Sequence, residues 1–278
     1  MTFFVPAYDV EHPEFCPRGL RRILGIHEEL AVPATFFVVG RLLEEDAPTY
    51  RGLLDRPWAD IQSHTYSHLL LRDSKVHGAG CRPEEARREI ELGKRLVEDT
   101  FGRPCVGLRT GCGFEEGLSG RGDLLGFLRG AGYEFVSSAL RGPGDTLPAP
   151  LRGPSTYAAD GYPELLELPG HGWHDNVLTA PEPGRLPIVA WPPLEDWFLP
   201  PRRPATPEEA AEVYTTWVEK AAERGLPYVS LVWHPGSLHR FDGECRTVRL
   251  VLERARRLGL EFCTYARLAR GFREVEHG

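Results

Sequence analysis

Residues 3–40 read FFVPAYDVEHPEFCPRGLRRILGIHEELAVPATFFVVG and contain a strand–helix–strand pattern. The aromatic and aliphatic residues at 3–10 predict a strand close to the N-terminus. Residues 17–30 predict a helix, because Pro17 suits a first helical position. The β-branched and aromatic run TFFVV at 35–39 predicts the next strand. This order of elements indicates a β–α–β unit with parallel strands.

The same alternation of strands and helices continues to about residue 265. The clearest helix is PEEARREIELGKRLVEDTF at 83–101. Glu84 and Glu85 stand in its first turn, where the helix dipole favours acids, and Gly102 follows its end. Further strands are expected at 59–63, 106–109, 133–137, 228–233 and 261–265, and further helices at 41–54, 124–130, 207–224 and 244–258. About seven such units predict an α/β fold, specifically a distorted (β/α) barrel.

A Pro- and Gly-rich stretch at about 141–204 interrupts this pattern, with short extended pieces at 165–168 and 188–191. We interpret it as an insertion into one barrel domain that spans residues 1–278, because a chain of this length is commonly a single α/β barrel.

Composition narrows the possible partners. The net charge of -7 argues against nucleic acid or an anionic membrane surface, since both attract basic proteins. No apolar run is long enough for a transmembrane helix, and residues 2–9 lack the features of a signal peptide, so we expect a cytoplasmic location and a small-molecule substrate. The six cysteines are scattered without a C-x-x-C pair, which predicts reduced thiols. No pattern indicates an oligomeric state.

Two histidines follow the expected strand at 59–63, in the run SHTYSH at 63–68. His64 and His68 are four residues apart, so both imidazoles would share one face if the loop turned helical. Neutral imidazole is a good zinc ligand, although a zincin would need Glu at position 65, where this chain has Thr65. One structural and one exposed histidine is the competing interpretation.

Three other strand ends carry residues suited to chemistry. Asp9 and Glu11 share a face at the end of the first strand, so one could bind a metal while the other acts as a general base. Arg109 ends another strand and could hold the carboxylate of that base. His234 ends the strand at 228–233 and could protonate a leaving amine. Capping, ion pairing and structural hydrogen bonding remain the ordinary alternatives for each residue.

The insertion contains the polar and aromatic run GHGWHDN at 170–176. Its His171, Trp173 and His174 could line a substrate pocket or form a solvated loop. The remaining histidines have no supporting pattern and are expected at the surface: His12, His27, His77, His239 and His277.

Taken in order, these motifs resemble those of the polysaccharide deacetylase family, the chitooligosaccharide deacetylase homology group of carbohydrate esterase family 4. The run YDVE at 8–11 resembles the acidic first motif, SHTYSH at 63–68 the metal-binding motif, and VWHP at 232–235 the motif with the catalytic histidine. The run RTGCGF at 109–114 stands in the place of a motif similar to Arg-Pro-Pro-Tyr. TFFVVG at 35–40 resembles the usual second strand.

The resemblance implies a distorted (β/α) barrel with a divalent metal, usually zinc, held by one acidic residue and two histidines. By position it implies Asp9 as the base, Arg109 as its tether and His234 as the acid. Glu11, His64 and His68 would hold the metal, and Cys112 and Phe114 would contribute to the substrate pocket with His171, Trp173 and His174.

This chain departs from many family members, which carry two adjacent aspartates in the first motif. Its Asp-Val-Glu pattern at 9–11 resembles the branch that includes cofactor-independent allantoinases. Thr110, Gly111 and Cys112 replace the prolines and ring of the pocket wall, so a substrate other than polymeric chitin is plausible. The first hypothesis is N-deacetylation of a small acylated sugar or similar amide. A cyclic amide hydrolase, allantoinase- or cyclic-imidase-like, is the alternative, followed by a non-catalytic carbohydrate-binding barrel.

Overall fold

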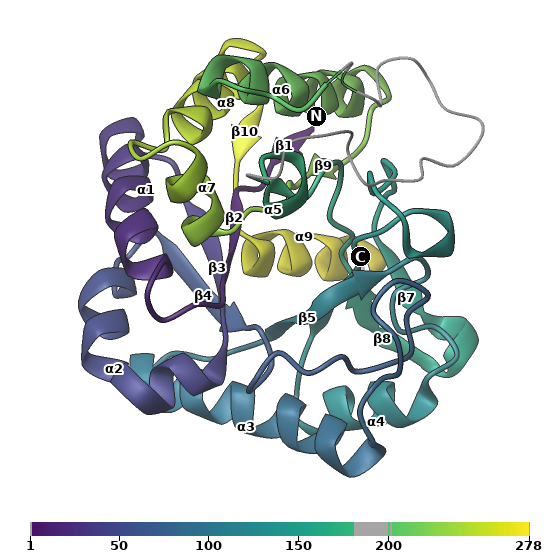
Figure 1. Cartoon of the computed structure of the whole chain (residues 1–278). Coiled ribbons are helices and arrows are strands. Elements are labelled where there is room, and N and C mark those ends of the chain that lie inside the picture. Colours follow the sequence, from purple (N-terminus) through teal and green to yellow (C-terminus); the bar gives the residue numbers. More distant parts are fainter. Residues whose placement is uncertain (1, 181–199, 201, 278) are drawn as a thin grey trace.

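The computed structural model describes residues 2–180, 200 and 202–277, and shows an α/β fold in which helices surround parallel strands (Figure 1). Seven strands form one sheet in the order β2-β3-β4-β5-β6-β8-β7, and three form another in the order β10-β1-β9. Among the strands of the described residues, only β7 and β8 pair antiparallel. The strand bounds are β1 Phe3–Phe4, β2 Ala7–Val10, β3 Ala34–Val38, β4 Ala59–Ser63, β5 Gly107–Phe114, β6 Phe135–Ala139, β7 Ser155–Tyr157, β8 Tyr162–Glu167, β9 Tyr228–Val229 and β10 Glu261–Phe262.

The segment after β9 closes the strands into a barrel. The backbone N–H of Asp9 in β2 donates to the carbonyl of Trp233, with a distance of 2.8 Å. On the other side, the N–H of His171, which follows β8, donates to the carbonyl of Ser230, also at 2.8 Å. The two ends of the main sheet therefore meet on one segment, which satisfies backbone groups that an open sheet would leave unpaired. This closure confirms the expected distorted barrel.

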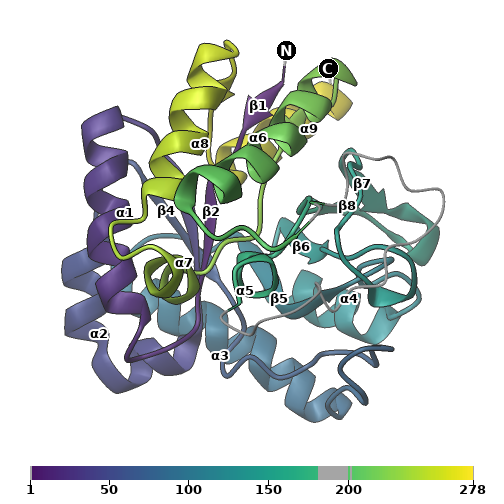
Figure 2. The ribbon, with the colours of Figure 1, turned by 45° about the horizontal axis from the view of Figure 1, so that its top comes forward.

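Helices cover the outside of the barrel (Figures 1 and 2). Their bounds are α1 Cys16–Leu30, α2 Gly40–Leu54, α3 Pro83–Phe101, α4 Gly122–Gly130, α5 Asp175–Leu178, α6 Pro207–Glu223, α7 Pro235–Phe241, α8 Arg246–Arg257 and α9 Tyr265–His277, with 3₁₀ turns η1 at Pro143–Asp145 and η2 at Ala158–Asp160. Two glycines allow helices to approach neighbouring segments closely. A Cβ on Gly19 of α1 would lie 1.9 Å from the carbonyl oxygen of Pro235, and one on Gly93 of α3 would lie 2.7 Å from Ser63 Oγ.

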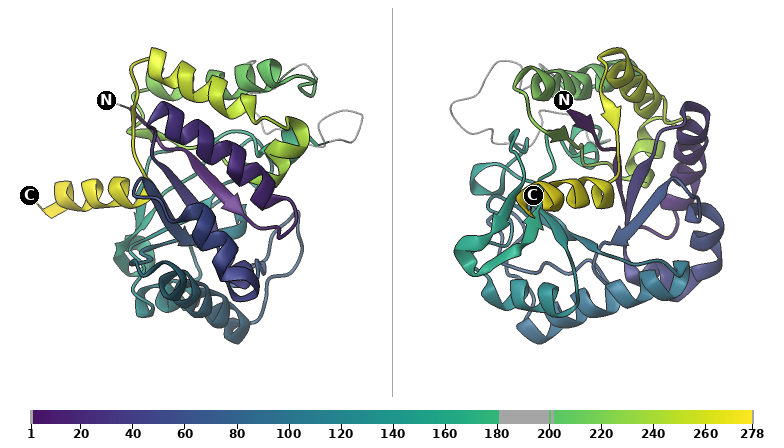
Figure 3. Two further views of the ribbon diagram at one scale, coloured as in Figure 1. Left: turned by 90° about the vertical axis from the view of Figure 1, so that its left-hand side faces the viewer. Right: turned by 180° about the vertical axis from the view of Figure 1, so that it is seen from behind.

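Helix α9 was not expected from the sequence and crosses the end of the barrel opposite α5 and α7 (Figure 3, right panel). Its first residue, Tyr265, is fully buried and packs against Phe37 and Phe135, whose ring centroids lie 5.2 and 5.8 Å away. These rings belong to a buried cluster inside the barrel that also contains Leu166 and Tyr228. One end of the barrel is therefore filled mainly with apolar side chains.

The elements agree closely with the expected ones where the local pattern is strong. Strand β4 and helix α3 have the predicted bounds. Strand β5 instead extends to Phe114. Its pairing with β6 is irregular between Arg109 and Phe114, the part that contains the glycines.

The segment at 141–204 is less separate from the barrel than expected. Strand β8 lies within it and pairs in parallel with β6. The extended piece expected at 188–191 lies outside the described residues. The single-domain organisation stays a prediction.

Candidate active site

Side chains from several strand ends meet in a cavity of about 140 Å³. Asp9 belongs to β2, and Glu11 follows that strand. His64 follows β4, and His234 immediately precedes α7. All four residues line the cavity, which lies at the carboxyl ends of the parallel strands, where (β/α) barrels carry their functional residues.

His64 and His68 meet through a tight loop and not through the helical turn considered from the sequence. Thr65 and His68 both have positive φ angles, of 63° and 65°. The buried carboxylate of Glu89 in α3 holds this loop by accepting hydrogen bonds from the N–H and hydroxyl of Ser67, at 2.7 and 2.6 Å. The two imidazole rings consequently stand edge to face, with centroids 4.9 Å apart.

The two imidazoles converge on one oxygen of Glu11. Glu11 Oε1 lies 2.9 Å from His64 Nε2 and 3.0 Å from His68 Nε2. The carbonyl oxygen of Arg109 lies 2.9 Å from His64 Nδ1 and can only accept, so this nitrogen carries the proton. In neutral His64 the Nε2 lone pair therefore faces a carboxylate oxygen. A divalent cation would relieve this repulsion, so the donor set fits the metal that the family resemblance implies.

Asp9, Glu11 and His234 form a second group whose donor atoms lie within 4.8 Å of one another. Asp9 Oδ1 already accepts from Arg109 Nη1 at 2.9 Å. A cation bound next to this guanidinium would be repelled, so Glu11 with His64 and His68 is the better metal site.

The Asp9–Arg109 pair is buried beneath the cavity. Arg109 is fully buried, and the Asp9 residue is 2% exposed. Arg109 also donates to the hydroxyl of Tyr265 at 2.7 Å and lies over the ring of Phe37 at 4.3 Å. These contacts hold the guanidinium in one place, and because only Oδ1 of Asp9 is bound to it, Oδ2 is left for the cavity side.

His234 is oriented by a carboxylate that sequence reasoning had not singled out. Its Nδ1 lies 2.5 Å from Oδ1 of Asp175, the first residue of α5, while its Nε2 lies 3.4 Å from Glu11 Oε1. Burial alone would lower the pKa of His234, but the negative charges of Glu11 and Asp175 raise it well above the ordinary histidine value. His234 is therefore held as an imidazolium, the form in which it can donate a proton.

The expected pocket residues divide into two groups. Cys112 and His174 line the cavity. Phe114, His171 and Trp173 do not, and each is at most 2% exposed. His171 is bound on both ring nitrogens by backbone groups, Nε2 by the carbonyl of Arg152 at 2.9 Å and Nδ1 by the N–H of Ser230 at 3.1 Å, which explains its place in the packed interior.

The cavity wall contains residues that sequence reasoning missed. Asp175, which holds His234, is fully buried, whereas Arg141, Asn176 and His77 line the cavity. His77 is also exposed, as expected. A correction concerns His27, which is buried, accepting at Nε2 from the Tyr8 hydroxyl and donating from Nδ1 to the Val32 carbonyl. Of the other three, His12 is exposed, His239 is partly exposed, and the His277 side chain lies outside the described residues. No local pattern marks Arg141 or His77, because their contact joins two distant loops.

Sequence comparison connects this geometry to known proteins. Residues 8–119 match the family model for polysaccharide deacetylase. The resemblance to the polysaccharide deacetylase family seen in the motifs is therefore found again over this segment of the chain. A curated relative, the chitooligosaccharide deacetylase of Rhizobium leguminosarum bv. phaseoli, is 28% identical over 97 residues, which is 35% of this chain. The chain spans 38% of the length of that relative.

Solved structures show the same fold over nearly the whole chain. A putative polysaccharide deacetylase from Mycobacterium smegmatis is 19% identical, with a TM-score of 0.68 over 99% of this chain and 92% of its own. PuuE allantoinase is 14% identical, with a TM-score of 0.65 over 97% of this chain and 88% of its own. At these identities the likeness shows a shared fold. Within the described residues, no helix is long and apolar enough to cross a bilayer.

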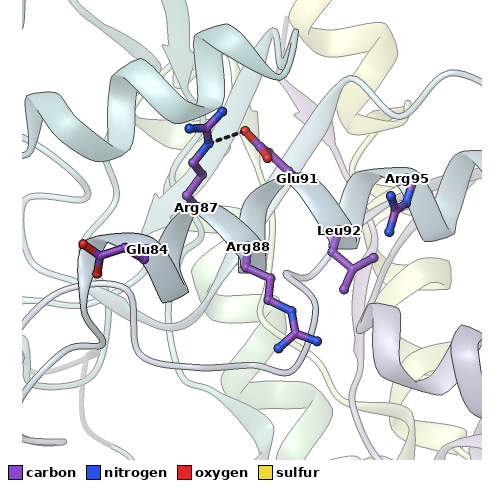
Figure 4. A pocket seen from close by; sticks show the side chains of 6 residues that line it. All are labelled: Glu84, Arg87, Arg88, Glu91, Leu92 and Arg95. Carbon is purple, nitrogen blue, oxygen red and sulfur yellow. Dashed lines mark hydrogen bonds and ion pairs between the residues drawn. The ribbon is translucent and has the colours of Figure 1, made fainter.

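A second hollow lies on the outer face of α3 (Figure 4). Figure 4 shows its side chains spread along one helix, with Arg87 and Glu91 paired at 2.7 Å. The other lining residues shown are Glu84, Arg88, Leu92 and Arg95. The ion pair joins residues four apart on one helix, which is the ordinary arrangement of a solvated helix surface.

Proposed function

We propose that this chain hydrolyses a non-peptide amide bond, most simply by metal-assisted N-deacetylation of a small acylated sugar or a similar amide. The observation that carries the proposal is the convergence of Glu11, His64 and His68 on one point beside Asp9 and His234. The match of residues 8–119 to the polysaccharide deacetylase family model supports the reaction class.

Glu11, His64 and His68 would hold the metal, and one carboxylate with two imidazoles is a donor set that suits zinc. A divalent ion in this position supplies Lewis acidity toward an amide carbonyl and lowers the pKa of water. Burial disfavours ionisation of Glu11, but the positive charge of His234 keeps the pKa of Glu11 well below the usual range. Glu11 is therefore available as an anionic ligand.

Asp9 and His234 divide the proton transfers. Asp9 Oδ2 lies 4.0 Å from His234 Nε2, so a reacting group can lie within reach of both. Asp9 accepts a proton from the attacking water as the water oxygen bonds to the carbonyl carbon. His234 Nε2 gives its proton to the amide nitrogen as the C–N bond breaks, and the products are a carboxylic acid and an amine.

The size of the cavity favours a small substrate. Its volume of about 140 Å³ is below the ~300–1,000 Å³ of usual ligand pockets. It would hold an amide group and its near neighbours, with Cys112 and His174 forming part of the wall. The small volume also favours a cyclic amide as the alternative substrate, and the Asp-Val-Glu motif at 9–11 supports that second candidate.

The test is a substrate panel assayed with the purified chain supplied in turn with zinc, cobalt or nickel. We expect acetate release from at least one small N-acetylated sugar or amide, together with about one bound metal per chain by elemental analysis. Ring opening of allantoin or a cyclic imide without acetate release would select the second candidate. No turnover of any amide would favour a non-catalytic barrel and contradict the proposal.

A further inference from the structure

Arg141 follows strand β6 and lies in the wall of the same cavity. The residue is only 8% exposed, so its guanidinium has lost most of its water. Burial lowers the pKa of this group from its ordinary value, although Asp145 partly offsets the effect. A buried cation normally needs a compensating negative charge or a full set of hydrogen bonds.

The hydrogen bonds of Arg141 are incomplete and reach only neutral groups. Nε donates to the Cys112 carbonyl at 3.3 Å, Nη1 to the Asp145 carbonyl at 3.0 Å and Nη2 to His77 Nε2 at 2.8 Å. A guanidinium has five N–H donors, so one on each Nη has no hydrogen-bond partner among the described residues. Two adjacent donors of this kind are the fork that binds a carboxylate or phosphate.

The carboxylate of nearby Asp145 and those that line the same cavity are engaged elsewhere. The Asp145 carboxylate accepts backbone hydrogen bonds from Lys75 and Glu115, at 3.0 and 2.8 Å. Asp9 and Glu11 are held by Arg109 and by the imidazoles, as described above. Within the described part of the chain, Arg141 has no ion pair.

The neighbours of Arg141 add polarity without adding a negative charge. His174 Nε2 donates to the Leu140 carbonyl at 2.9 Å, and burial, with nearby Arg141 and His234, lowers the pKa of His174 well below its ordinary value, so this imidazole is neutral. Asn176 presents an amide to the cavity from an exposed position. A negatively charged ligand group would therefore meet an unpaired cation and neutral hydrogen-bonding groups.

We propose that Arg141 binds an anionic oxygen group of the substrate, a carboxylate or a phosphate, so that the cavity selects N-acylated compounds with a negative charge close to the amide. The assignment of an amide substrate rests on the proposed function, whereas the binding of the anion does not. Arg141 thereby acts as a specificity-determining residue.

The test is calorimetric binding of two matched ligand pairs to the metal-loaded chain. N-acetylglycine and N-acetylglycinamide differ only in a carboxylate against a carboxamide. N-acetylglucosamine 6-phosphate and N-acetylglucosamine differ in a phosphate. We expect the charged member of at least one pair to bind about 10- to 100-fold more tightly, the range for charge-assisted hydrogen bonds. The pair that shows the preference identifies the anion, and equal binding in both pairs would overturn the proposal.

Variants assign the preference to Arg141. Arg141→Gln should lose it, and Arg141→Lys should keep part of it, with folding checked by circular dichroism. A folded Arg141→Gln chain that keeps the full preference would overturn the proposal, because the metal or another cation would then be its source.

A second pair of variants covers the case in which neither arginine variant folds. Asn176 is exposed, so Asn176→Asp should fold and should weaken the anion preference by placing a negative charge at the cavity, while Asn176→Ala should retain it. Equal preferences in Asn176→Asp and the unsubstituted chain would also overturn the proposal. Acetate release is followed separately, so an anion preference without turnover would contradict the deacetylase function and leave the anion site standing.

Discussion

The cavity end of the barrel, where Asp9 and Arg109 lie, and the outer face of α3 carry similar charged side chains in different surroundings. Arg87 and Glu91 on α3 pair at 2.7 Å, with side chains 61% and 47% exposed. Arg109 and Asp9 beneath the cavity pair at 2.9 Å, with side chains 0% and 3% exposed. Because the two distances are nearly equal, burial and the surrounding partners distinguish the candidate site from a solvated helix surface.

The energetic consequence of this difference is large. An exposed pair four apart on a helix stabilises by only about 0.3–0.5 kcal/mol, since water screens both charges. Breaking a buried pair costs roughly 3–5 kcal/mol, because one charge is left buried without its partner. Equivalent substitutions in the two regions therefore test whether the cavity is organised for chemistry.

The largest loss of activity is expected from removing a proposed metal ligand in the cavity. His64→Ala or His68→Ala should abolish metal binding and lower kcat by more than roughly 10⁴-fold, beyond the usual loss of a general acid. Elemental analysis and acetate release measure the two effects. Full activity of the unsubstituted chain without bound metal would instead support a metal-free site in which Glu11 interacts only with the imidazoles.

The next effect concerns His234, which should donate a proton without holding the metal. His234→Ala should retain metal but lose roughly 10²–10⁴-fold in kcat, the usual contribution of a general acid. Steady-state kinetics and metal analysis of the same preparation check this. Unchanged kcat would remove His234 from the mechanism.

Arg109 provides the direct contrast with the surface pair. Arg109→Gln should destabilise the fold by roughly 3–5 kcal/mol, since Asp9 would stay buried without its partner. Urea denaturation measures the change, with Arg87→Gln on α3 as the matched control. Equal losses in the two variants would mean that burial does not distinguish these regions.

Substitution on the inner face of α3 should lower the stability of the fold far more than substitution at exposed helix positions. A Cβ on Gly93 would approach Ser63 Oγ and the carbonyl carbon of Thr65, both at 2.7 Å. Gly93→Ala should therefore cost roughly 1–3 kcal/mol of stability, as overpacking does, and weaken metal binding by displacing the loop that carries His64. Gly52→Ala on α2 is the control, because among the described residues an added Cβ would meet no atom within 4 Å beyond its chain neighbours and its own helix backbone, and alanine favours a helix. A tolerated Gly93→Ala substitution would show that this loop can adjust.

The smallest effect is expected on the outer face of α3. Arg87→Ala or Glu91→Ala should change stability by no more than about 0.5 kcal/mol and leave kcat unchanged. A marked loss of activity in either variant would show that the hollow on α3 takes part in function. The same denaturation and acetate assays apply.

The parts of this fold that depend on local pattern were predictable. Helix α3 is indicated by Pro83, two acids in its first turn and Gly102 after its end, all of which act within one or two turns. The strand ends near Asp9, His64 and His234 follow from runs of a few apolar residues. The sequence was therefore sufficient to predict a barrel with candidate chemistry at these strand ends.

The remaining features depend on contacts between distant residues. Asp175 holds His234 across 59 positions of the chain, and Arg141 contacts His77 across 64. Helix α9 covers the end of the barrel opposite the cavity, and its Tyr265 accepts a hydrogen bond from Arg109, 156 positions away in the chain.

Local propensity thus specified which segments become helices and strands, and which reactive side chains stand at their ends. The packing of the barrel decided which of those side chains face the cavity, which are buried as Phe114, His171 and Trp173 are, and which carboxylate orients His234. The physical reason is that secondary structure depends on near neighbours, whereas burial and hydrogen-bond partners depend on how the closed barrel brings its loops together.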